Sequence, residues 1–140
     1  MTVIVDAAPI IAAASPNDRL CARIRDVMRS EVRLVVPAPV TAEIDYLLRH
    51  RVGVGAAHSF LDDVSAGLIE VVGLTAPEHA TARRLDGQYK DLGIGLAGAS
   101  VIVLAHRLRT TRVLTLDQRH FRAVRSLDGN PFTILPFDTT

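Results

Sequence analysis

Three acidic residues follow short apolar runs in this chain. Asp6 follows Val3–Val5, Glu43 comes shortly after Leu34–Val36, and Asp117 lies two residues after Val113–Thr115. Carboxylate oxygens are the ligands that Mg²⁺ and Mn²⁺ prefer in proteins. A metal ion held in this way can activate water and stabilise the leaving oxygen when a phosphodiester is cleaved. If the three runs are parallel strands, the acids indicate a site for such a cation at one edge of a sheet.

Each acid also has a structural alternative. Asp6 could cap the helix that follows it, Glu43 could complement the dipole at a helix N-terminus, and Asp117 could start a turn. Taken singly, each residue fits this alternative better. Taken together, three acids at strand ends in one small chain favour the shared site.

The elements that must position these acids alternate between strand and helix. Short β-branched or apolar runs predict five strands, at Thr2–Val5, Leu34–Val36, Leu68–Val72, Val113–Thr115 and Phe132–Leu135, the last at a sheet edge. Helical spacing and breakers predict helices at Ala7–Ala14, Leu20–Met28 (capped by Asn17 or Asp18), Thr41–Arg51, Ala56–Val64, Pro77–Tyr89 and Ala97–Leu108, with a helical turn at His120–Val124. Such alternation predicts a parallel sheet, within one domain over residues 1–140.

Other kinds of chemistry find less support. The five histidines have no metal-ligand spacing, and Cys21 has no partner for nucleophilic catalysis. The segment Gly93–Gly98 matches the G-x-G-x-x-G pattern of dinucleotide-binding proteins. That pattern requires a strand immediately before it, whereas Leu85–Asp91 is expected to be helical. Nucleotide binding at this loop is therefore a weak alternative.

Composition limits the remaining classes of protein. The formal net charge is only +1, but fifteen of the sixteen basic residues are arginine, and several lie in the last third of the chain. Arginine binds phosphate in a bidentate manner, although such clusters are often only solvated surface. A single cysteine suits a reducing cytoplasm. No apolar run is long enough to span a membrane.

Three segments together resemble the PIN-domain ribonucleases, specifically the VapC-type toxins of bacterial toxin–antitoxin systems. The segments are VIVDAAPIIAA, VPAPVTAEIDYLL and GLAGASVIVLAHRLRTTRVLTLDQRHF, and the resemblance covers essentially the whole chain. It implies a three-layer α/β/α sandwich with a central, mainly parallel sheet. It also implies an endoribonuclease that depends on Mg²⁺ or Mn²⁺ and cleaves structured RNA such as tRNA or ribosomal RNA. A homodimer and a small antitoxin protein are the implied partners.

The resemblance assigns roles position by position. Asp6, Glu43 and Asp117 match acids of the family's catalytic site, and Thr115 matches a position that often holds a hydroxyl near the metal. The remaining acid is expected in GLADAS, but this chain has GLAGAS, so Gly98 stands where an aspartate is expected. Near the last acid, Arg112, Arg119 and His120 are candidate RNA contacts.

Gly98 leaves the activity of this chain open. Loss of one carboxylate weakens a metal site, and glycine in a helical turn costs about 1 kcal/mol relative to alanine. Gly98 fits either a natural, weak or inactive paralogue or an inactivating substitution. The alternative function is a catalytically inactive PIN-like module that binds antitoxin or RNA. A receiver-type signalling domain is weaker still, because the paired acids and the lysine it requires are missing.

Overall fold

A computed structural model describes residues 1–31 and 33–138. Within them, five strands form one sheet in the order β3-β2-β1-β4-β5, and every neighbouring pair is parallel. The strands are β1 (Thr2–Val5), β2 (Arg33–Pro37), β3 (Glu70–Val72), β4 (Arg112–Leu114) and β5 (Thr133–Leu135). The predicted parallel sheet is confirmed, and β5 lies at its edge as expected.

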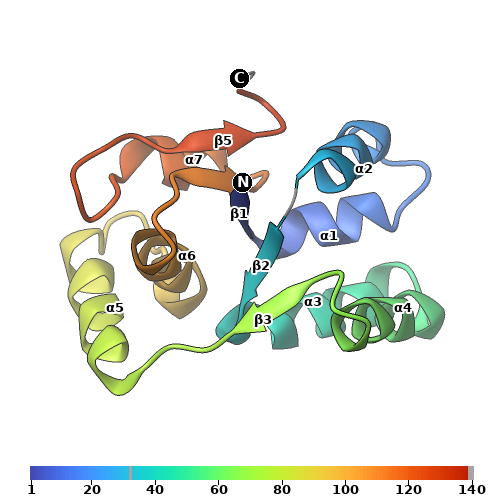
Figure 1. The fold of residues 1–140 in the computed structure, drawn as a ribbon, viewed down its shortest axis with the longest axis horizontal. Helices are drawn as coiled ribbons and strands as arrows, with labels where there is room; N and C mark the ends of the chain where they lie inside the picture. The colour runs from blue at the N-terminus through green and yellow to red at the C-terminus, as the bar shows by residue number, and fades with distance from the viewer. Residues whose placement is uncertain (32, 139–140) are drawn as a thin grey trace.

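Seven helices connect and cover the strands. They are α1 (Ala7–Ala13), α2 (Cys21–Ser30), α3 (Ala38–Arg51), α4 (Val54–Ser65), α5 (Ala76–Gln88), α6 (Gly95–Arg107) and α7 (Gln118–Ala123), counted within the described residues. Figure 1 shows α1 to α4 on one side of the sheet, with α5 and α6 on the other. The result is the expected three-layer α/β/α sandwich.

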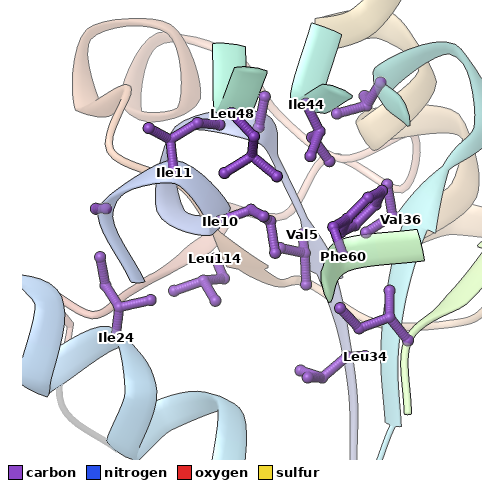
Figure 2. Close-up of a cluster of buried hydrophobic side chains, with 14 of the residues drawn as sticks. Val5, Ile10, Ile11, Ile24, Leu34, Val36, Ile44, Leu48, Phe60 and Leu114 are labelled. Atoms are coloured by element: carbon purple, nitrogen blue, oxygen red, sulfur yellow. The ribbon is translucent and has the colours of Figure 1, made fainter. Parts of the chain in front are cut away.

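Alternate side chains of the central strands belong to two separate hydrophobic cores. In β1, Val3 and Val5 pack with the α1–α4 side, whereas Ile4 packs with the α5–α6 side. Figure 2 shows the first core, where Val5 and Ile10 lie beside Leu48 and Ile44 from α3. Because both faces of the sheet are covered, the strands are almost continuously apolar, as parallel strands usually are.

Most element boundaries differ from the sequence prediction by one to three residues, and two of these shifts have a clear local reason. Helix α3 begins at Ala38, three residues before the predicted Thr41. Pro39 falls in its first turn, where the missing backbone N–H has no helical partner to lose. Strand β3 begins at Glu70 rather than Leu68, because the N–H of Leu68 donates to the carbonyl of Asp63 (3.0 Å) in the turn that ends α4.

Candidate active site at the switch between two strands

The order of the strands changes direction between β1 and β4. The chain runs outward from β1 to β2 and β3, and then returns to the other side of β1 as β4 and β5. Ligands of open α/β sheets bind at such a switch point, beyond the carboxyl ends of the strands. Asp6 directly follows β1, and Asp117 follows β4 by three residues. The backbone N–H of Asp6 donates to the carbonyl of Leu114 (2.9 Å), which ties the two strand ends together.

Thr115 joins the two acids through one fully buried hydroxyl. Its Oγ1 donates to Oδ2 of Asp6 (2.9 Å) and accepts from the backbone N–H of Asp117 (3.0 Å). A single side chain therefore sets the orientation of the Asp6 carboxylate and the path of the backbone at Asp117. Thr115 was predicted to lie near the metal-binding acids, and its hydrogen bonds join it to both Asp6 and Asp117.

The buried surroundings of Asp6 disfavour the ionised form of its carboxyl group. Burial raises its pKa above the usual value, and the negative charge of Asp117 raises it further. Hydrogen bonds from the Ala7 N–H (2.9 Å) and from Thr115 act in the opposite direction and do not cancel the effect. A cation between Asp6 and Asp117 would relieve both the burial penalty and the repulsion between the acids.

Asp117 is held from the opposite side by His120. The Oδ1 atom accepts from the His120 backbone N–H (3.0 Å), which caps α7, and Oδ2 lies 2.7 Å from His120 Nδ1. Asp6 likewise caps α1 through Ala7. Asp6 thus performs the capping role that was its alternative, and Asp117, for which a turn was the alternative, also caps a helix. The two acids still share Thr115. His120, predicted to contact RNA, is placed as a partner of Asp117.

Gly98 lies in the first turn of α6, where the family's aspartate is expected. This helix leads back into β4, which is parallel to β1, so its N-terminus lies at the same edge of the sheet as the acids. The space beside Gly98 is partly filled. A Cβ built at this residue would lie 3.1 Å from the Cβ of Ile94, a contact that requires Ile94 to shift by a few tenths of an ångström.

Within residues 1–31 and 33–138, Glu43 and the two arginine candidates form no hydrogen bond or ion pair with Asp6 or Asp117. Glu43 is exposed on the second turn of α3. Arg112, at the amino end of β4, forms an ion pair with Glu31, and Arg119 is exposed on α7. In residues 1–31 and 33–138, no three His, Cys, Asp or Glu side chains are grouped closely enough to hold a metal ion.

The donors that remain fit a weakly held magnesium or manganese ion. Mg²⁺ commonly binds through one or two carboxylates and keeps several waters. Asp6 and Asp117 supply that minimum, and Thr115 holds them together. A third carboxylate at position 98 would complete the set.

A pocket beside Asp117 was not anticipated from the sequence. It has a volume of about 560 Å³ and is lined by Arg19, Leu20 and Arg23 near the start of α2, by Leu116 and Gln118 on either side of Asp117, and by Phe137. The four-residue spacing of Arg19 and Arg23 was visible in the sequence. The sequence did not show which other element would pack near these two arginines, because that depends on the tertiary structure.

Comparison with known proteins agrees with this geometry. The family model described as the PIN domain matches residues 3–127. This chain belongs to the PIN-domain family. The PIN-domain chain is 39% identical, over 137 residues, to Ribonuclease VapC26 of Mycobacterium tuberculosis, a match that covers 96% of this chain and 100% of that protein. The expected resemblance to VapC-type ribonucleases is confirmed.

Solved structures share the fold of this PIN-domain chain at 16% sequence identity. VapC20 of Mycobacterium tuberculosis, a toxin that cleaves the sarcin–ricin loop, matches with a TM-score of 0.72 over 79% of this chain and 86% of that one. VapBC2 of Rickettsia felis, bound to a DNA fragment from its promoter, matches with a TM-score of 0.66 over 91% and 96%. FitAcB of Neisseria gonorrhoeae matches with a TM-score of 0.62 over 84% and 88%.

In the part of the chain that the structure describes, no helix is both long enough and apolar enough to cross a bilayer.

Proposed function

We propose that this PIN-domain protein is the toxin of a type II toxin–antitoxin pair, built as a metal-dependent endoribonuclease and impaired by Gly98. The observation that carries the proposal is the Asp6–Thr115–Asp117 arrangement at the switch point of the sheet. The identity to Ribonuclease VapC26 over nearly the whole chain supports the RNA-cleaving activity.

The protein's own residues prepare the site. Asp6 and Asp117 would hold Mg²⁺ or Mn²⁺, which when bound supplies an activated water and charge stabilisation for phosphodiester cleavage. Thr115 fixes the orientation of Asp6, and His120 fixes that of Asp117. Glu43 remains a proposed catalytic acid. It follows β2 on α3, the helix whose N-terminus lies at the same edge of the sheet.

We also propose a substrate, a protein partner and a cellular location. The substrate would be structured RNA such as tRNA or ribosomal RNA, in keeping with the activity of VapC20 on the sarcin–ricin loop. The partner would be a small cognate antitoxin protein, as the VapBC2 match suggests. A homodimer in the cytoplasm is the proposed working form.

The decisive experiment restores the missing carboxylate. Purified protein, Gly98→Asp and Gly98→Ala are incubated with a tRNA and ribosomal RNA pool, with and without Mn²⁺, and cleavage is followed on gels. We expect Gly98→Asp to cleave at least about tenfold faster than the present chain, since one lost catalytic interaction commonly costs this much or more. Cleavage should require Mn²⁺ and disappear when Asp6→Asn is added.

Gly98→Ala is the matched control for packing. Both substitutions introduce a Cβ against Ile94, but only aspartate adds a ligand. If Gly98→Asp binds Mn²⁺ and cleaves no faster than Gly98→Ala, the enzymatic proposal fails. The chain would then be the non-catalytic binding module.

A further inference from the structure

We propose that the pocket beside Asp117 is a subsite for one nucleotide of a single-stranded RNA segment, next to the scissile phosphate. The inference rests on the proposed ribonuclease function and adds the residues that would receive the substrate. The pocket is lined by Arg19, Leu20, Arg23, Leu116, Gln118 and Phe137. Leu116 and Gln118 flank Asp117 in the chain, so the pocket borders the backbone segment that carries Asp117.

The charge of the pocket favours a polyanion. Its charged lining residues are Arg19 and Arg23, and no acid lines it. Asp18, the nearest acid in sequence, is engaged with the Leu20 N–H (2.8 Å). Arg19 is exposed and forms no ion pair within residues 1–31 and 33–138. Guanidinium groups bind phosphate oxygens through paired N–H donors.

Two other pockets, one larger and one smaller, lack this character. The pocket of about 790 Å³ near the end of α6 includes the acids Glu78 and Asp128, and its Arg107 is already bound by Glu78. The groove of about 450 Å³ among α1 to α4 is lined mainly by apolar residues and contains Asp63 beside Arg25 and Arg29. Both are therefore less suited to RNA than the pocket beside Asp117.

The walls of the pocket suit a base rather than phosphate alone. Leu20, Leu116 and Phe137 are half-buried, each with one side against a hydrophobic core. An aromatic ring and apolar side chains beside arginine are the usual receptor for an unstacked RNA base. This combination distinguishes the pocket from an exposed patch of arginines, which would bind any polyanion.

Gln118 adds a hydrogen-bond donor to the pocket. Its Oε1 accepts two N–H groups of Arg122 (3.1 and 3.0 Å), and Arg122 is itself neutralised by Asp138 (2.8 Å). The side-chain NH₂ of Gln118 is then the group left to donate to an acceptor on a base edge. Arg23 is anchored in a similar way, because its Nη2 donates to the carbonyl of Pro136 (2.6 Å). The pocket is thus largely preformed.

The test measures binding of RNA without cleavage. Affinity for a short, fluorescein-labelled single-stranded RNA is measured by anisotropy, in EDTA and over a range of salt concentrations, for the protein, Arg19→Gln and Phe137→Leu. Arg84→Gln is the matched control, since Arg84 is an exposed arginine on α5. Figure 1 shows α5 and α2 on opposite sides of the sheet. Urea denaturation checks that Phe137→Leu remains folded.

The two substitutions should weaken binding in different ways. Arg19→Gln should lower the affinity and reduce the slope of log K against log salt by about 0.7, the value for one lost phosphate contact on a single strand. Phe137→Leu should lower the affinity about fivefold or more with the salt slope unchanged, because stacking is not ionic. Arg84→Gln should bind like the unaltered protein.

Three results would overturn the subsite. They are unchanged affinity in both pocket variants, an equal loss in Arg84→Gln, and a loss confined to Arg19→Gln, which would indicate a general basic surface. The subsite and the enzymatic function fail separately. If the pocket variants lose affinity as expected while Gly98→Asp never cleaves, only the ribonuclease proposal is wrong. If Gly98→Asp cleaves and the pocket variants bind normally, only the subsite is wrong.

Discussion

Thr115 is the residue on which the geometry of the two acids depends. Its buried hydroxyl serves Asp6 and the backbone N–H of Asp117 at once. We expect Thr115→Val, which keeps the shape and removes the hydroxyl, to lower the free energy of unfolding by about 1–3 kcal/mol. The reason is that a buried donor and a buried carboxylate each lose a partner. Urea denaturation at neutral pH measures this change.

Thr115→Ser is the control, because it keeps the hydroxyl and loses only a methyl group. It should retain most of the stability that Thr115→Val loses. If Thr115→Val is as stable as the unaltered protein, the hydroxyl contributes nothing and the bridge between the acids is not structural.

At the scale of single elements, Glu78 connects two helices on the α5–α6 side. It closes a capping box at the start of α5 with Thr75, and its Oε2 accepts from Nε of Arg107 at the end of α6 (2.9 Å). The hydrogen bond from Arg107 is the main cause that lowers the pKa of Glu78 to about 2. The unfolded chain therefore binds a proton at a higher pH than the folded protein does.

This difference gives a pH dependence with a definite sign. The pair stabilises the fold fully above the ordinary pKa of glutamate, near 4.5, and the contribution is lost as the pH falls toward 2. Glu78→Gln should cost roughly 1 kcal/mol at neutral pH, a small value because solvent screens this surface pair. The difference from the unaltered protein should shrink between pH 4.5 and 2 in urea titrations. A constant difference across that range would contradict the assignment.

Helices and strands were predictable where a local pattern decides them. The apolar run before Asp6 defined β1 to the residue, and every predicted helix is present with shifted ends. Two of these shifts arise where a residue type is compatible with more than one local structure. A proline can close a strand or stand in the first turn of a helix, and Pro39 takes the second position, in α3. Similarly, α6 begins at Gly95, in the segment that resembles a nucleotide-binding loop, and the helix α5 before it confirms that no strand leads into that loop.

The candidate site was predictable only in part. Asp6 and Asp117 follow neighbouring strands, so the strand pattern was enough to bring them together, whereas the role of Thr115 followed from the resemblance to the family. The partners of His120 and Arg112 depend on side-chain packing. Arg112 forms an ion pair with Glu31, 81 residues away in the chain, and the imidazole of His120 contacts the carboxylate of Asp117. The pocket beside Asp117 was missed because α2 and the segment around Phe137 meet there only in the folded molecule.

At the scale of the whole molecule, metal binding should raise the free energy of unfolding. A ligand that binds only the folded state stabilises it by RT ln(1 + [L]/Kd), about 2.7 kcal/mol at a hundredfold excess over Kd. The site spans β1, β4 and the start of α6, so unfolding destroys it and the linkage applies to global unfolding. We expect Mn²⁺ to raise the Tm of the present chain slightly, and that of Gly98→Asp at severalfold lower concentration. Gly98→Ala should respond like the present chain, since it adds a Cβ but no ligand. Thermal denaturation over a series of Mn²⁺ concentrations measures these shifts. Equal responses of the aspartate and alanine variants would show that position 98 does not contribute to the metal site, whether or not the protein cleaves RNA.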